Sequence, residues 1–174
     1  MKHTLETARL LLRPPVIEDL AAFDSWCGNP ANVRYMGWGP NSEDHTRAFL
    51  GSTNPGEHFA VVLKATGQVI GCVGIHPDKA MDTAELGWIL HMDHWKQGYG
   101  TELTGELIRY GFADLKLRRL TAPCAAANYG SCRVMERNGM RREALHVKAH
   151  WARVDKEWID RAEYAILAEE YELK

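Results

Sequence analysis

The sequence predicts a single α+β domain built around one mixed β-sheet. Three short apolar runs between residues 59 and 90 are joined by tight turns, which indicates an antiparallel meander. A helical spacing of apolar residues follows over 98–117, and strand-like and helix-like segments then alternate to the end of the chain. A chain of 174 residues can bury one complete core. Because it holds no repeat or linker, residues 1–174 are expected to form one domain.

The elements before the meander are one strand and two helices. Residues 8–13 are predicted to form a strand, which a Pro-Pro pair stops. Apolar residues at helical spacing predict a helix over 18–26, which a Gly-Asn-Pro sequence ends. A second helix is expected to begin at Asn41 or Ser42 and to reach Leu50, because acidic residues occupy its first turn.

The meander and the second half of the chain complete the sheet. The meander strands are expected at 59–63, 69–75 and 84–90. After the long helix, the chain predicts a strand at 119–125, a helix at 129–137 and strands at 143–151 and 158–167. Pro123 inside one of these strands suggests an edge, a bulge or a splayed pairing.

Composition excludes several classes of protein. The 21 Lys and Arg residues are balanced by 23 Asp and Glu residues, which argues against a nucleic-acid-binding protein. No apolar run reaches the length of about 18 residues that a membrane span needs. The N-terminus lacks the apolar centre of a secretory leader. None of the four cysteines forms a C-x-x-C pair, so we expect reduced thiols and a cytoplasmic protein.

The most informative segment runs from Trp95 to Glu102 and opens the long helix. Gly98 and Gly100 let the backbone approach a ligand closely, and free N–H groups at a helix start favour a phosphate or pyrophosphate. A P-loop is excluded because the lysine precedes the glycines, and a dinucleotide fingerprint lacks its third glycine. Taken alone, the segment also fits a plain glycine-rich turn before a helix.

The sequence Trp95-Lys96-Gln97-Gly98-Tyr99-Gly100 resembles the [QR]-x-x-G-x-[GA] signature of the GNAT N-acetyltransferase superfamily. Trp replaces Gln or Arg at the first position, and this departure resembles the subgroup of ribosomal-protein N-terminal alanine/serine acetyltransferases. Four further segments resemble family elements in the family's order: the opening strand at 7–14, the Ala-Glu-Leu-Gly-Trp strand at 84–88, the N-x-x-S segment at 128–140 and the closing strand at 158–167. The resemblance therefore covers nearly the whole chain.

This resemblance implies a three-layer fold with a mostly antiparallel sheet of about seven strands and about four helices. The strands at 84–90 and 119–125 are implied to splay apart. Acetyl-CoA is the implied co-substrate: the backbone of 97–101 would hold its pyrophosphate, and the end of the 84–90 strand would pair with its pantetheine arm. The implied cofactor contacts are Ile89, Leu90, His91, Lys96, Gln97, Gly98, Tyr99, Gly100, Thr101, Asn128 and Ser131.

The implied chemistry is direct attack of an amine on the thioester in a ternary complex, without an acyl-enzyme. Glu85 is the candidate base, acting through a water, although it also fits an exposed strand glutamate. Ser131 is the candidate proton donor or thiolate stabiliser, although it also fits a helix-cap serine. Tyr129 is the alternative donor. No metal is expected, because the pair His91-x-x-His94 lacks the further ligands of a zinc site.

The acceptor is expected to be an amine that a modest base can use. An unperturbed α-amine has a pKa of ~7.7–8.0 and an unperturbed lysine one of ~10.4, so about a third of α-amines but only about one lysine in a thousand is free near pH 7.5. This favours an α-amine or a small amine of low pKa, and the resemblance to the ribosomal-protein subgroup implies a protein N-terminus. The resemblance implies that Trp38 and Glu85 contact the acceptor, although Trp38 also fits an aromatic residue packed in its loop. A small-molecule amine acetyltransferase of the same fold, a non-catalytic acyl-CoA-binding module and a binding domain for another nucleotide remain alternatives. A homodimer is among the expected assemblies.

Overall fold

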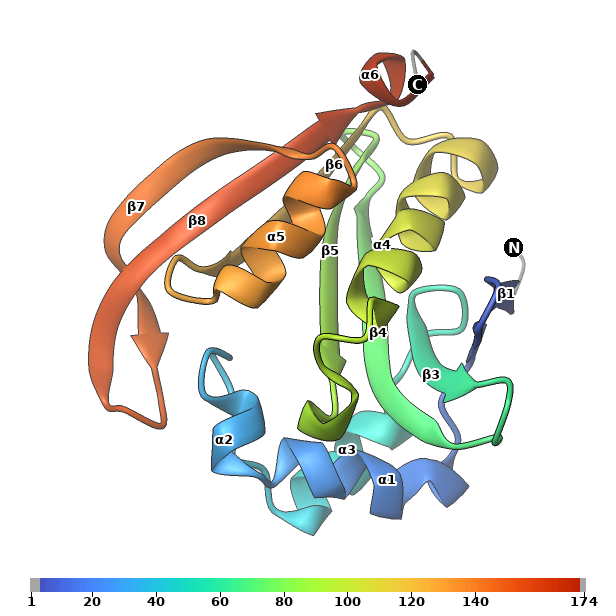
Figure 1. Ribbon diagram of the computed structural model, residues 1–174, viewed down its shortest axis with the longest axis vertical. Helices are drawn as coiled ribbons and strands as arrows, with labels where there is room; N and C mark the ends of the chain where they lie inside the picture. The colour runs from blue at the N-terminus through green and yellow to red at the C-terminus, as the bar shows by residue number, and fades with distance from the viewer. Residues whose placement is uncertain (1–3, 173–174) are drawn as a thin grey trace.

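The computed structural model describes residues 4–172 and shows one eight-stranded sheet between two layers of helices (Figure 1). The strands are β1 (Leu5–Glu6), β2 (Leu10–Arg13), β3 (His58–Leu63), β4 (Val69–Asp78), β5 (Thr83–Leu90), β6 (Arg119–Ala125), β7 (Arg141–Ala152) and β8 (Glu157–Leu167). The helices are α1 (Leu20–Cys27), α2 (Pro30–Val33), α3 (Glu43–Gly51), α4 (Tyr99–Arg109), α5 (Tyr129–Arg137) and α6 (Ala168–Glu172). Among residues 4–172, no helix combines the length and hydrophobicity needed to cross a bilayer.

The strand order is β1-β2-β3-β4-β5-β6-β8-β7, and β5 with β6 is the parallel pair among antiparallel neighbours. The predicted α+β class, the meander and the mixed, mostly antiparallel sheet are confirmed. The strand count is one higher than expected, because β1 is only two residues long and carries no periodic signal.

Alternation along the central strands divides the apolar side chains between two cores. Leu86 and Leu90 of β5 pack with Leu120 of β6 and with the inner faces of α4 and α5. On the opposite face of the sheet, Phe23 and Trp26 of α1 pack with other buried apolar residues of α1, α3, β3 and β4. The three layers that the resemblance implied are therefore present.

Two helical boundaries differ from the predictions. The Gly-Asn-Pro sequence ends α1 but also starts α2, because the side chain of Asn29 accepts the N–H of Ala31 at 3.0 Å and Pro30 suits a first helical position. The long helix predicted to reach Leu117 keeps its α-helical form only to Arg109. A π-helical turn follows over Tyr110–Asp114.

The parallel pairing of β5 and β6 covers only three positions, of which Glu85 opposite Thr121 is the last. Beyond that point β5 stays paired with β4 and β6 stays paired with β8, so the predicted splay is confirmed. Just after β6, the N–H of Ala126 donates to the carbonyl of Asp160 in β8 at 2.8 Å. By alternation the nitrogen of Pro123 faces the splay, where the lack of an N–H removes no ladder hydrogen bond.

Candidate active site

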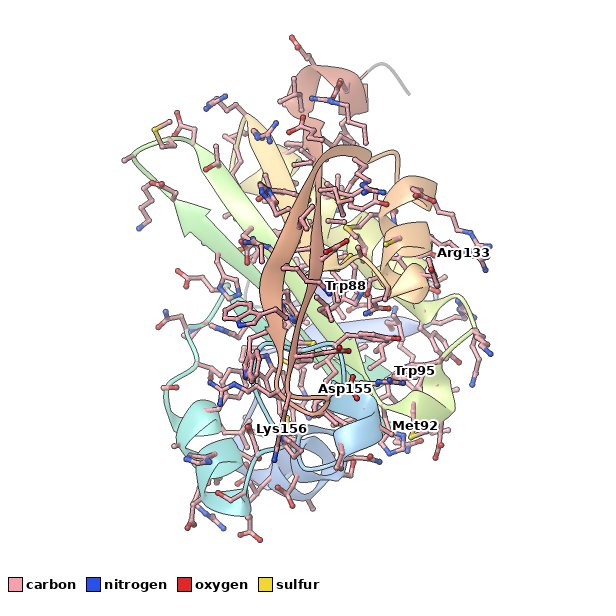
Figure 2. The ribbon with its side chains drawn as sticks, turned by 90° about the vertical axis from the view of Figure 1, so that its left-hand side faces the viewer. Trp88, Met92, Trp95, Arg133, Asp155 and Lys156 are labelled. Atoms are coloured by element: carbon pink, nitrogen blue, oxygen red, sulfur yellow. The ribbon has the colours of Figure 1, made fainter. Side chains whose placement is uncertain are left out.

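A cleft of ≈ 700 Å³ opens where β5 and β6 separate. Four segments line it: the 32–36 region, the end of β5, the loop that enters α4, and the first turns of α5. Figure 2 labels Trp88, Trp95 and Arg133, which belong to three of these segments. The lining residues are Asn32, Tyr35, Met36, Trp88, Ile89, Leu90, His94, Trp95, Lys96, Gly98, Tyr99, Gly100, Thr101, Ala127, Asn128, Tyr129, Gly130, Ser131, Arg133, Val134 and Arg137.

The edge of β5 at the splay presents backbone groups that β6 does not pair. The N–H of His91 donates to Ile70 at 2.8 Å, so His91 and every second residue before it face β4. The N–H and C=O of Trp88 and the N–H of Leu90 therefore face the diverging β6. A ligand that hydrogen-bonds as a neighbouring β-strand would can use these two donors and this one acceptor.

The carbonyl of Leu90 is already used. It accepts the indole N–H of Trp95 at 2.8 Å and the side-chain amide of Asn32 at 3.1 Å. Asn32 is buried, and its Oδ1 accepts the backbone N–H of Met92 at 2.7 Å. These bonds fix the turn that leads from β5 toward α4.

This alternation turns the backbone groups of Ile89 and His91 toward β4, although Ile89 itself lines the cleft as predicted. The His91 N–H is committed to β4, the Ile89 carbonyl lies against Gly71 of β4, and His91 does not line the cleft. Trp88, which the sequence analysis did not select, takes their place. Strand alternation counted from the last residue that pairs with β6 could have identified it.

The start of α4 has the backbone geometry that favours an anion. Gly98 is its N-cap with a φ of 83°, a left-handed conformation that suits glycine, and Lys96 also has a positive φ of 60°. The unpaired N–H groups of the first helical turn and the helix dipole favour a phosphate at this point. A Cβ on Gly100 would lie 3.1 Å from Val134, so this glycine lets α4 and α5 approach each other closely.

Arg9 supports this loop from outside the cleft. Its Nη1 donates to the carbonyl of Gln97 at 3.0 Å, and its guanidinium lies 4.4 Å from the centre of the Tyr99 ring. Gln97 itself does not line the cleft, in contrast to the prediction. Its carbonyl has a structural role in the same loop.

Asn128 and Ser131 meet at the start of α5. The Oδ1 of Asn128 accepts the backbone N–H of Ser131 at 3.2 Å, so Asn128 caps the helix. The helix-cap alternative for Ser131 is therefore wrong. Both residues line the cleft with Tyr129, opposite the α4 loop, and Arg133 and Arg137 add positive charge.

Glu85 lies on the face of β5 opposite the side chains of Leu86 and Leu90, is exposed, and does not line the cleft. A Cβ added to Gly87, two residues further on the same face, would meet nothing within 4 Å. The backbone of Gly87 is therefore uncovered by other groups on this face, next to Glu85 along the strand.

Trp38 lies outside the cleft, and its neighbours Tyr35 and Met36 form the wall instead. The sequence analysis selected the correct segment but not the residues that line the cleft. The choice depends on how the segment turns after α2.

The sulfur atoms of Cys124 and Cys132 lie 3.6 Å apart beside the cleft. Burial, with the neighbouring Cys132, raises the pKa of the Cys124 thiol well above its ordinary value. Cys124 is therefore a poor acyl carrier. In the described part of the chain, no group of three or more His, Cys, Asp or Glu side chains could hold a metal ion.

A mixed sheet that splays beside a helix start suited to an anion is the arrangement expected of an acyl-CoA-dependent transferase. The family model described as Acetyltransferase (GNAT) domain matches residues 9–141, and the chain belongs to this family. It is a GNAT acetyl-CoA-dependent N-acetyltransferase.

Relatives match over almost the full length. The chain is 32% identical to the uncharacterized N-acetyltransferase YnaD of Bacillus subtilis over 96% of this chain and 98% of that protein. A GNAT-family acetyltransferase structure from Bacillus anthracis superposes with a TM-score of 0.89 at 32% identity, covering 96% of this chain and 99% of the other. Spermidine N-acetyltransferase of Vibrio cholerae, in complex with CoA and spermine, shares the fold at a TM-score of 0.84 and 21% identity, covering 95% and 99% of the two chains.

Proposed function

We propose that this enzyme transfers the acetyl group of acetyl-CoA to a protein N-terminal α-amine by direct attack in a ternary complex. The observation that best supports this proposal is that one edge and one face of β5 both contribute to the site. One edge offers the unpaired backbone of Trp88 and Leu90 to the cleft, and Glu85 and the open space at Gly87 occupy the adjoining face.

In this proposal acetyl-CoA lies along the cleft between the end of β5, the α4 loop and the start of α5. We assign the pyrophosphate to the N–H groups at the start of α4, with the cation of Lys96 nearby. We assign the pantetheine arm to the backbone of Trp88 and Leu90 and to the side chain of Asn128. The N–H of Leu90 or Trp88 then polarises the thioester carbonyl as negative charge develops on its oxygen.

Two side chains take the proton steps in this proposal. Glu85 accepts the proton of the attacking amine through a water, since it stands beside the open space at Gly87 rather than in the cleft. The Ser131 hydroxyl donates to the leaving sulfur or stabilises the thiolate. Its backbone N–H alone serves Asn128, so the hydroxyl is not needed for capping.

The preference for an α-amine follows from proton availability. An α-amine is partly deprotonated near neutral pH, whereas a lysine needs a stronger base. The proposed machinery has one carboxylate, and it acts from an exposed position. This arrangement suits an acceptor whose proton is easily lost.

Thermal denaturation with acetyl-CoA, ATP or NAD tests the cofactor. A ligand at ~100 times its dissociation constant stabilises by about 2.7 kcal/mol, and acetyl-CoA alone is expected to raise the Tm. Initial rates with a Ser-initiated hexapeptide, the same peptide with a blocked N-terminus and an internal lysine, and spermidine test the acceptor. A higher kcat/KM for spermidine than for the free N-terminus would refute the α-amine proposal.

Two further expectations belong to this proposal. All four cysteines are unbridged, which supports action in a reducing compartment such as the cytoplasm. The homodimer stays a prediction, which light scattering at micromolar concentration tests directly.

A further inference from the structure

The segment that carries α2 is attached to the tip of the β7–β8 hairpin by a set of contacts that we call the clasp. Arg34 Nε contacts the carboxylate of Asp155 at 2.8 Å, and Arg153 Nε donates to the carbonyl of Gly37 at 2.8 Å. The ring of His150 packs against the same segment, because its Cε1 lies 3.6 Å from the position that a Cβ on Gly37 would take. Figure 2 shows Asp155 at the hairpin tip, beside the helical layer.

The other side of the same segment is attached to the end of β5. Buried Asn32 bonds the carbonyl of Leu90 and the N–H of Met92, as described above. The segment therefore spans from the open end of β5 to the hairpin, and Figure 1 shows α2 between the two. Residues 32–37, which we call the bridge, cross the splay at its wide end.

The bridge forms one wall of the cleft. Asn32, Tyr35 and Met36 line it together with Trp88. Since the unpaired backbone of Trp88 lies in this part of the cleft, the bridge limits how an acceptor reaches it. A shift of Tyr35 and Met36 would change the width of that approach without touching the α4 anion site.

Stability alone does not explain the clasp. The Arg34 side chain is 56% exposed and that of Asp155 29%, and ion pairs of this kind contribute little to folding. Nε2 of His150 is buried without a hydrogen-bond partner, which is a cost of packing the hairpin on the bridge. The clasp is better explained by the position that it gives to residues 32–37.

We propose that Arg34, Asp155 and Arg153 are positioning residues that set acceptor selectivity. By fixing Tyr35 and Met36, they keep the approach narrow enough for the end of a chain or a slim amine and exclude an amine in the middle of a chain. They also shield the thioester from water. This inference rests on the proposed acetyl transfer and adds a selectivity device to it.

Charge reversal at the clasp tests the inference. Arg34→Asp and Asp155→Arg each break the ion pair, and the double variant restores it in the opposite orientation. At saturating acetyl-CoA, each single variant is expected to lower at least fivefold the preference for a Ser-initiated peptide over the N-blocked lysine peptide. The change is expected in acceptor KM rather than kcat. Acetyl-CoA hydrolysis without acceptor should rise at least threefold, and the double variant should return both values to within twofold of the parent.

Arg47→Asp is the matched control. It breaks a 2.6 Å ion pair with Glu43 on the surface of α3, which is comparable in kind but does not line the cleft. Unchanged preference and hydrolysis in both single variants would overturn the inference, as would changes that the double variant does not reverse. If the parent accepts neither peptide, hydrolysis of acetyl-CoA decides by itself. Absence of any Tm shift with acetyl-CoA is a separate result, because it removes the proposed function and this inference with it.

Discussion

Glu102 in the first turn of α4 is bound twice by Arg9: the backbone N–H of Arg9 donates to Oε1 at 2.8 Å, and the guanidinium Nε contacts Oε2 at 2.6 Å. The Thr7 hydroxyl donates to the same carboxylate at 2.5 Å. Burial opposes ionisation of Glu102, but these donors outweigh it and hold its pKa below the ordinary value. The corner before β2 is thereby attached to the helix start that we assign to the pyrophosphate.

Glu102→Gln is expected to weaken acetyl-CoA binding without slowing the chemistry. Loss of the charge frees Arg9, and with it the bond to the Gln97 carbonyl that holds the loop. We expect the KM for acetyl-CoA to rise about three- to tenfold, a loss of roughly 0.7–1.4 kcal/mol, with kcat within twofold. Glu106→Gln, which breaks a pair with Arg109 on the same helix, is the control. Equal effects in both variants would contradict a specific role for Glu102.

Glu85→Gln is expected to slow the acetyl transfer itself. Removing a general base typically costs about 10²-fold or more in rate, and binding of acetyl-CoA should stay unchanged because Glu85 does not line the cleft. Steady-state kinetics over pH 6–9 with the Ser-initiated peptide measures the effect. Glu163→Gln, on the same sheet face two strands away, should stay near the parent rate. A Glu85→Gln variant with the parent's kcat would exclude Glu85 as the base.

The long elements could be predicted because their signals are local. Strands β4 and β5 and helix α5 appear as runs or periodic patterns in their own residues, and the capping residue Ser42 marks the start of α3. Helix α2 has four residues, fewer than periodicity can detect, and its only signal is the Asn29-Pro30 start. Pro123 indicated the splay only as one of three alternatives, and the family resemblance was needed to choose it, since the splay depends on where two distant strands stop pairing.

The residues of the candidate site also divide into those with a local sequence signal and those without one. The α4 loop and the α5 start are contiguous segments, so Gly98, Gly100, Asn128 and Ser131 could be selected from the sequence. Residues such as Asn32 and Tyr35 reach the cleft from a segment that lies about fifty positions before β5 in the chain. Their role comes from tertiary packing, which a single sequence does not display.

His150 is expected to make stability depend on pH. Burial lowers the pKa of its imidazole and nearby Arg161 lowers it further, against an opposing hydrogen bond with the Tyr35 backbone. A folded pKa below the unfolded value of about 6.5 means that the unfolded chain binds the proton more readily. The contribution of the neutral His150 side chain to the free energy of unfolding is therefore fully present above about pH 6.5, and it is lost as the pH falls through the folded pKa. Tm values between pH 7.5 and 5.5 should fall more steeply for the parent than for His150→Gln, with exposed His45→Gln as control. Parallel curves for parent and His150→Gln would show that another group titrates.

At the start of α5, variants can distinguish the structural role of Asn128 from the proposed chemical role of Ser131. Asn128→Ala removes the cap, which typically costs about 1 kcal/mol, and in a chain of this length a loss of that size lowers the Tm by roughly 2–4 °C. Ser131→Ala keeps the backbone N–H that Asn128 binds, so its Tm should equal the parent's while kcat falls about tenfold or more. Tyr129→Phe at the exposed first position of the helix should change neither. The reverse result, a slow Tyr129→Phe and a normal Ser131→Ala, would assign the proton for the leaving sulfur to the tyrosine, because both hydroxyls belong to the same wall of the cleft.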